Sequence, residues 1–147
     1  MRRVRAAVAA VLRNPENERE VLIVRRPADD DRLPNVWGLP AVTLAPGELP
    51  EAGLRRLGRD KLATEIEPVR LVGIRSEDLG AYELILLDVE ARLVGEEPSV
   101  AAAPGPGTRY VGQEWTEDLS RLAEAARRGS LCARILLEES GLLDDSY

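Results

Sequence analysis

The sequence contains no histidine and no phenylalanine, and it has a single cysteine, Cys132, and a single lysine, Lys61. Without histidine there is no Ser-His-Asp triad, no Cys-His pair and no imidazole metal ligand. One cysteine excludes an internal disulfide and a cysteine-rich zinc site. The remaining chemistry is that of carboxylates, hydroxyls and arginines, and a carboxylate-bound hard cation such as Mg²⁺ suits this inventory best.

Length and charge limit the organisation and the partners of the chain. Its 147 residues are typical of one domain, so we expect a single domain over residues 1–147. The formal net charge of −6 disfavours a polymeric nucleic acid as partner, because such binding needs a basic face that neutralises phosphates. No apolar run approaches the roughly 20 residues of a membrane span, so no membrane partner is expected.

The N-terminus has the outline of a secretory signal, since residues 1–5 are rich in arginine and residues 6–12 are apolar. The apolar run is short for a signal and closes on Arg13 without a convincing cleavage site. We therefore interpret it as a strand and expect the protein in the cytoplasm.

Apolar runs and turn residues predict a mixed order of strands and helices. Ser130 is expected to cap the last helix and Gly141 to end it, and Thr116 is expected to cap the helix before it. We expect strands over residues 4–12, 21–24, 69–74, 82–94 and 109–115, and helices over residues 50–61, 116–128 and 130–139.

The predicted helix over residues 50–61 carries a potential apolar stripe of Leu54 and Leu57, continued by Leu62. Gly53 and Gly58 should weaken this helix by about 1 kcal/mol each relative to alanine. Its other residues are largely charged, so one face is expected to meet solvent.

The most specific pattern lies between Val21 and Thr64. A strand ends in Arg25-Arg26-Pro27, and after a loop come Trp37-Gly38-Leu39-Pro40, then Pro46-Gly47-Glu48, then an arginine-bearing helix. This arrangement resembles the Nudix hydrolase family. The box of that family reads G-x5-E-x7-R-E-U-x-E-E-x-G-U, where U is apolar, and W-x-L-P-G usually precedes it.

The resemblance implies an α/β (α+β) fold: an α/β/α sandwich with a mixed central sheet, the box helix on one side and the C-terminal helix on the other. It also implies hydrolysis of a small-molecule nucleoside diphosphate derivative, with Mg²⁺ or Mn²⁺ as cofactor. The box glutamates recur three and four residues apart, so they share one helix face. There they hold the metal against the diphosphate and help to activate water.

The sequence departs from the box at its acids, and two registers are open. In the first register Arg56 is the box arginine. The acid positions then hold Leu57, Asp60 and Lys61, and the two glycine positions hold Val42 and Ala63.

The second register deletes one residue, so that Arg55 is the box arginine and the acid positions hold Arg56, Arg59 and Asp60. We prefer it slightly, because it buries Leu57 and exposes Gly58. In both registers one helix acid survives, as Asp60, and a cation stands at one or more of the other positions. Because such a cation repels Mg²⁺, the leading hypothesis is a family member with weak or lost hydrolase activity.

The resemblance supplies Asp60 and Glu48 as candidate catalytic and metal-binding acids. For Glu48 it also implies a salt bridge to the box arginine, Arg55 or Arg56, and we favour this structural role. Asp60 could instead form a helix-surface pair with Arg56.

Arg25, Trp37, Arg56 and Arg59 are the candidate substrate-binding residues. In the family the strand that ends at Arg25 borders the substrate cleft, and alternation sends only one of Arg25 and Arg26 inward. A guanidinium there could clamp a phosphate with two hydrogen bonds. Trp37 could face the base of a nucleotide or could be a packing residue.

Two classes of function follow. The first is a metal-dependent hydrolase that recruits acids from elsewhere, with Glu48, Glu51, Glu77, Asp78 and the pair Glu96-Glu97 as candidates. The second is a module that binds a nucleotide, a diphosphate or another protein and needs no cofactor, with arginines in place of the metal charge. A homodimer is one oligomeric state that remains open.

Overall fold

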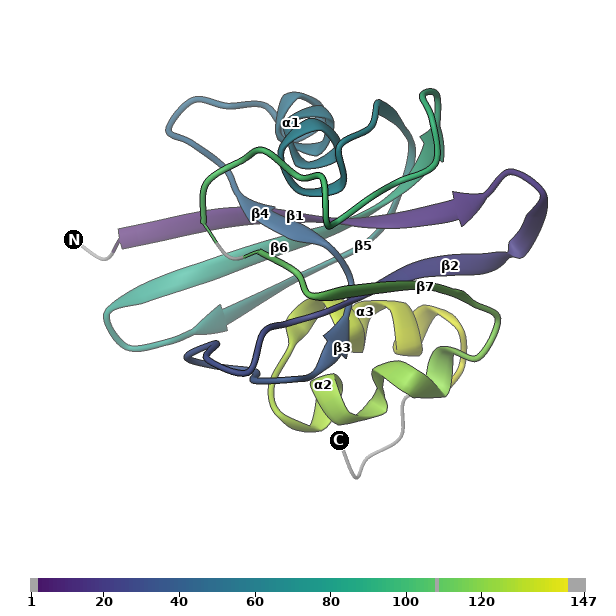
Figure 1. Ribbon diagram of the computed structural model, residues 1–147. Helices are drawn as coiled ribbons and strands as arrows, with labels where there is room; N and C mark the ends of the chain where they lie inside the picture. The colour runs from purple at the N-terminus through teal and green to yellow at the C-terminus, as the bar shows by residue number, and fades with distance from the viewer. Residues whose placement is uncertain (1–2, 108, 143–147) are drawn as a thin grey trace.

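The computed structural model describes residues 3–107 and 109–142, and the first two residues of the arginine-rich N-terminus lie outside this range. Strands dominate the first two thirds of the chain and helices the last part (Figure 1). The strands are β1 Arg3–Asn14, β2 Asn17–Arg25, β3 Trp37–Gly38, β4 Ala41–Thr43, β5 Ile66–Asp78, β6 Tyr82–Leu93 and β7 Gly112–Thr116. The helices are α1 Pro50–Leu62, the 3₁₀-helix η1 Leu119–Leu122, α2 Ala123–Arg127 and α3 Leu131–Glu139.

The strands form one mixed sheet around β1. Strand β1 pairs in parallel with β6 and antiparallel with β2 and β4, and the hairpin partners β5 and β6 run antiparallel. Helix α1 lies on one face of the sheet, and α2 and α3 lie on the other (Figure 1). The expected α/β/α sandwich with a mixed central sheet is confirmed.

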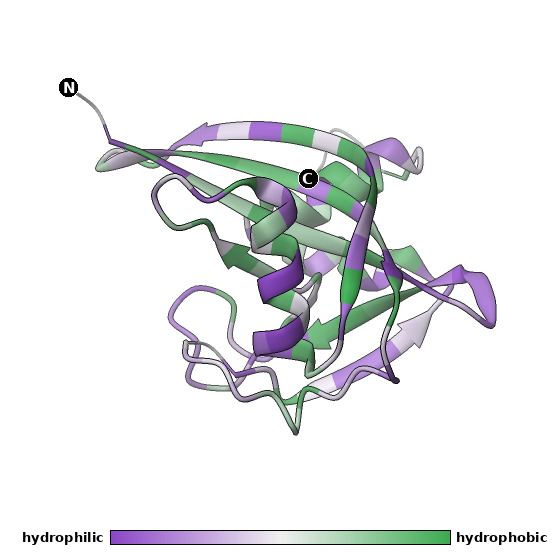
Figure 2. Ribbon diagram, turned by 90° about the horizontal axis from the view of Figure 1, so that it is seen from above, coloured by the Kyte–Doolittle hydropathy of each residue, from purple (hydrophilic) through white to green (hydrophobic). Residues whose placement is uncertain are grey.

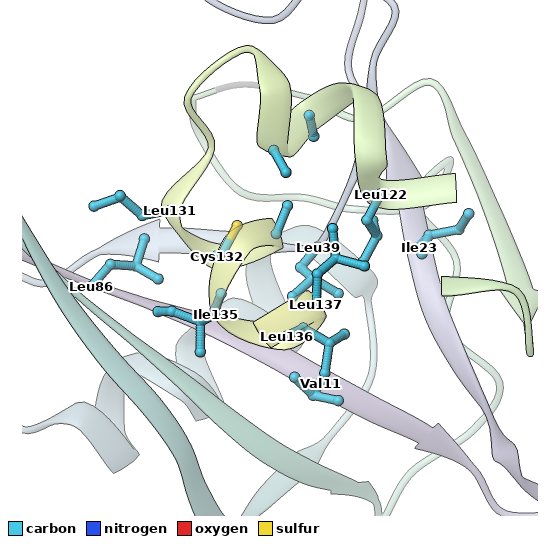
Figure 3. Close-up of a cluster of buried hydrophobic side chains, with 14 of the residues drawn as sticks. Val11, Ile23, Leu39, Leu86, Leu122, Leu131, Cys132, Ile135, Leu136 and Leu137 are labelled. Atoms are coloured by element: carbon cyan, nitrogen blue, oxygen red, sulfur yellow. The ribbon is translucent and has the colours of Figure 1, made fainter. Parts of the chain in front are cut away.

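Two apolar clusters, one on each face of the sheet, hold these layers together. Side chains of a strand alternate between its faces, and because helices cover both faces, both sets of β1 side chains are buried. Figure 3 shows the cluster on the α3 side, where Cys132 packs among leucines as a small core residue. In β1, Val8, Ala10 and Leu12 pack on the α1 side, and Ala7, Ala9 and Val11 pack on the α3 side.

Helix α1 buries Leu54, Leu57 and Leu62 completely, as the apolar stripe predicts. Figure 2 shows hydrophilic residues on α1 and mainly hydrophobic strands behind it. The expectation that Gly58 is exposed is wrong, because this residue faces the core. A Cβ at position 58 would lie 2.8 Å from Cγ1 of Ile66 and 2.9 Å from the carbonyl oxygen of Thr64. The glycine therefore permits close packing of α1 on β5.

The segment after β7 differs from the predicted helix over residues 116–128. Thr116 ends β7, where it pairs with Val21, so it caps no helix. Asp118 takes that role, since its side chain accepts a hydrogen bond from the backbone N–H of Ser120 and starts η1. The cap at Ser130 is confirmed, because its side chain accepts from the backbone N–H of Ala133.

Strand lengths also differ from expectation. The predicted strand over residues 69–74 is the centre of the longer β5, because pairing with β6 continues it in both directions. None of the helices formed by the described residues has the length and the apolar content needed to cross a membrane.

Candidate functional site

The loop before α1 is fastened to the helix by Glu48 and Arg56. The Arg56 guanidinium donates to the Glu48 carboxylate from Nε at 3.0 Å and from Nη2 at 2.9 Å, and Nη2 also donates to the carbonyl oxygen of Thr43 at 2.9 Å. The backbone N–H of Ala45 donates to Glu48 Oε1 at 3.0 Å. The expected salt bridge is present, and it is Arg56, not Arg55, that forms it.

These contacts determine the ionisation of the pair. The hydrogen bond from Arg56, and after it the one from Ala45, lowers the pKa of Glu48 to about 2. The same hydrogen bond raises the pKa of Arg56. Both carboxylate oxygens of Glu48 therefore accept hydrogen bonds from the loop or from α1. This arrangement suits a structural role better than metal coordination.

The geometry corresponds to the first register and corrects the preference for the second. Arg56 occupies the place of the box arginine, and Gly58 is buried at an apolar position. Ala63, at the position of the second box glycine, ends α1 in the left-handed conformation with φ of 52°. Glycine is the residue that normally adopts this conformation at a helix end.

The three acid positions of this register hold side chains in different environments. Leu57 is fully buried in the core beneath α1. Lys61 donates from Nζ to the carbonyl oxygen of Pro106 at 2.9 Å. Asp60 is half-buried, and its backbone oxygen accepts from the N–H of Gly105 at 2.9 Å. Of the residues at these three positions, Asp60 is the one that carries a carboxylate.

These residues do not fit a Mg²⁺ or Mn²⁺ ion. Such ions need several oxygen ligands in near-octahedral geometry, and an ammonium and a leucine offer none. Within residues 3–107 and 109–142 there is no group of three or more acids, cysteines or histidines that could hold a metal. Of the other acids considered, Glu97 accepts from Nε1 of Trp115, and Asp78 accepts from the backbone N–H of Gly80.

A cleft of about 400 Å³ opens beside the loop and α1. Ala7, Leu84 and Leu86 form part of an apolar wall. Among the described residues, no aspartate or glutamate lines this cleft. Its charged lining consists of Arg5, Arg26, Arg32, Arg56 and Lys61.

The ionisation of Lys61 responds to burial and to neighbouring charges. Burial lowers the pKa of Lys61, and the positive charges of Arg26, Arg56 and Arg109 lower it further, while the nearby carboxylate of Asp60 opposes them. The ammonium thus lies in a partly desolvated, electropositive place. The chemistry that this arrangement favours is the binding of an anion.

The predicted substrate-binding residues separate into two groups. Arg56 lines the cleft, whereas Arg59 is exposed and lies 3.7 Å from Glu65 on another part of the surface. Arg25 is also exposed and donates to Oδ1 of Asn35 at 3.3 Å, so of the two neighbouring arginines it is Arg26 that turns to the cleft.

Trp37 is a packing residue in this structure. Its ring packs against the α3-side cluster, and the guanidinium of Arg121 lies 5.0 Å from the ring centroid. Strands β3 and β7 both pair with β2, and a Cβ built at Gly112 of β7 would lie 3.3 Å from the ring. The indole is thus partly buried against the α3-side cluster.

Sequence reasoning missed Arg5 and Arg32 as cleft residues. For Arg5 a signal existed, because it stands two residues before Ala7 in the same strand and hence on the same face. Its guanidinium lies 4.5 Å from the ring centroid of Tyr82. For Arg32 no local signal existed, since the path of the loop after β2 decides its position.

The model of the NUDIX domain matches residues 3–92. No curated protein matches the sequence. Among solved structures, a NUDIX hydrolase from Nitrosomonas europaea has 19% identity and a TM-score of 0.71, covering 95% of this chain and 89% of that one.

Two further solved structures share the fold. A MutT protein from Methanosarcina mazei has 18% identity and a TM-score of 0.67, covering 93% of this chain and 96% of that one. An ADP-ribose pyrophosphatase from Streptococcus suis has 16% identity and a TM-score of 0.56, covering 79% of this chain and 75% of that one. At these identities the likeness shows a shared fold and nothing more specific.

Proposed function

Because the chain belongs to the NUDIX family, whose domain model matches residues 3–92, we propose that it binds a small nucleoside diphosphate derivative in the cationic cleft, with hydrolase activity that is weak or lost. Diphosphate derivatives are anionic, and five cations line the cleft. The protein would act in the cytoplasm. The negative net charge disfavours a polymeric nucleic acid, so the proposed ligand is a small molecule.

The observation that carries this proposal is the state of the box helix. Leu57 is buried in the core and Lys61 presents an ammonium, so two of the three acid positions cannot contribute a carboxylate. A lysine beside the one remaining acid, Asp60, disfavours a divalent cation by charge repulsion. The machinery that the family uses to activate water is thus reduced to a single group.

In this proposal the two acids have different roles. Glu48 holds the loop before α1 through Arg56, and Asp60 is the acid on which any residual turnover depends. A ligand phosphate would meet the cations of the cleft, while an uncharged part of the ligand would lie on the wall that includes Leu84 and Leu86.

A panel of nucleoside diphosphate derivatives tests the loss of activity. The panel should include ADP-ribose, because one solved structure with this fold is an ADP-ribose pyrophosphatase. Turnover measured with Mg²⁺ and with Mn²⁺ should be absent or slow, and Asp60→Asn should reduce whatever turnover remains. Fast metal-dependent turnover would instead establish an active enzyme with acids recruited from elsewhere.

A binding measurement tests the other part of the proposal, that the cleft binds a nucleoside diphosphate derivative. Calorimetric titration of the full chain with ADP-ribose and ADP, in the presence of Mg²⁺, should show saturable binding in the micromolar-to-millimolar range. If no member of the panel binds and none is turned over, a protein-interaction module becomes the better description.

A further inference from the structure

The charge of the cleft bears on how a ligand is held. Resting on the proposed ligand class, we propose that the cleft binds the phosphate groups directly, without a divalent metal ion, through Lys61, Arg26 and Arg32. Lys61 would take the place of the metal charge at the box helix.

The lining keeps a positive excess after its ion pairs are taken into account. Asp30 pairs with Arg26 at 3.2 Å, and Glu48 pairs with Arg56 at 2.9 Å. Asp60 lies near Lys61 and offsets part of its charge. Arg5 and Arg32 have no carboxylate within ion-pair distance among the described residues. A diphosphate that links two groups carries two negative charges and suits this excess.

Lys61 is placed to meet a phosphate. It is half-buried on the last turn of α1, and the carbonyl oxygen of Pro106 holds its Nζ from the segment that precedes β7. That segment passes beside α1 (Figure 1) and is anchored there by the hydrogen bond from Gly105 N–H to the oxygen of Asp60. Desolvation and neighbouring cations disfavour the charge of Lys61, so an anion in the cleft would relieve repulsion that a metal ion would increase.

The loop after β2 is ordered in a way that positions two guanidinium groups. The carboxylate of Asp30 accepts from Nη1 of Arg26 and from the backbone N–H groups of Arg32, at 3.2 Å, and Leu33, at 2.8 Å. Burial of Asp30 acts to raise its pKa, but the N–H of Leu33 and the charge of Arg26 outweigh it, and the pKa is lowered. Asp30 therefore stays ionised and fixes the loop that carries Arg26 and Arg32. The planar, permanently charged arginine head suits phosphate oxygens.

The decisive experiment is a titration without metal. Calorimetry in EDTA should show saturable binding of ADP-ribose and of inorganic pyrophosphate, and the affinity for ADP-ribose should be unchanged when Mg²⁺ replaces EDTA. Adenosine, which has no phosphate, should bind far more weakly. Binding should also weaken as salt is raised, because partly exposed charges are screened.

Matched variants locate the site. Lys61→Gln and Arg32→Gln should each weaken ADP-ribose binding about tenfold or more. Arg59→Gln removes the same charge from the same helix outside the cleft and should leave the affinity within about twofold of the unmodified protein. Lys61→Arg should restore most of the binding, because it returns the charge.

A measurement on the unmodified protein avoids any effect of substitution on folding. Lys61 is the only lysine, so acetylation at a lysine reports on this one side chain and is separated from the α-amino group by peptide mapping. ADP-ribose in EDTA should slow acetylation of Lys61, and adenosine should not.

The outcomes separate this inference from the function on which it rests. Binding that requires Mg²⁺ would overturn metal-free capture and leave the proposed function standing. Binding in EDTA that survives both Lys61→Gln and Arg32→Gln, with no protection of Lys61, would place the ligand elsewhere and overturn the inference. Absence of binding with and without Mg²⁺ would remove both.

Discussion

The Glu48 carboxylate and the Arg56 guanidinium form a two-point hydrogen-bonded ion pair, with N–O distances of 3.0 and 2.9 Å. Eight positions separate the two residues, and the pair closes the loop that joins β4 to α1. The remaining contact of Arg56, to the oxygen of Thr43, ties the end of β4 to the same point. The pair thereby positions the N-terminal half of α1 and one wall of the cleft.

Glu48→Gln should lower the free energy of unfolding by about 1–2 kcal/mol at neutral pH. This is less than a fully buried charged hydrogen bond contributes, because Arg56 is 34% exposed. The pKa of Glu48 is about 2 in the fold and 4.5 as an isolated group, so the pair stabilises fully above pH 4.5 and loses its effect as pH falls toward 2. Urea unfolding at a series of pH values should show this convergence, and the exposed Glu51→Gln is the control. A difference that stays constant with pH would contradict the role of ionisation.

Asp88 should make the protein less stable as pH rises. It is fully buried in β6, and neither of its carboxylate oxygens has a hydrogen-bond partner among the described residues. Burial raises its pKa to about 9, from 3.8 for the isolated group. The folded state thus keeps a proton that the unfolded state releases, and stability falls by up to about 1.4 kcal/mol per pH unit between pH 4 and 9.

Asp88→Asn removes this titration and tests it. The stability of the variant relative to the unmodified protein should rise between pH 4 and pH 9 and level off above pH 9. Chemical denaturation across this range measures the difference. If the two proteins keep the same difference at every pH, Asp88 is ionised in the fold.

Leu57→Glu should destabilise the protein by more than about 3 kcal/mol, because it places an acid that has no partner in the core beneath α1. Leu57→Met, which conserves volume, should cost less than about 1.5 kcal/mol. Thermal unfolding of both variants tests this. A stable Leu57→Glu protein would mean that α1 can rotate this position toward the cleft, and such a protein should then be assayed for Mg²⁺-dependent turnover.

Gly58→Ala should destabilise the fold by about 1–3 kcal/mol, although alanine has the higher helix propensity. The new Cβ would meet the backbone oxygen of Thr64 at 2.9 Å, and a backbone atom cannot move aside easily. Gly53→Ala is the matched control, because its Cβ would meet the flexible end of Leu44. Equal stability of the two variants would show that α1 can shift on β5.

Much of the fold follows from local patterns in the sequence. The apolar strands β1 and β2, the leucine stripe of α1 and the cap at Ser130 depend on neighbours within a few residues, and all four are present in the structure. The box pattern around Trp37 and Glu48 likewise led to the correct family. Thr116 departs from its local pattern, because pairing with Val21 across the sheet outweighs its preference for a helix cap.

The sequence by itself determined the chemical inventory: no histidine, a single cysteine and a single lysine. Only the tertiary structure decided which side chains meet. In the folded chain Arg56, not Arg55, is the partner of Glu48, and Arg26, not Arg25, turns to the cleft. Arg5 and Arg32 line the same cleft as Lys61. The physical reason is that these cations come from β1, from the loop after β2 and from α1. Their proximity results from packing between distant segments, which no local pattern encodes.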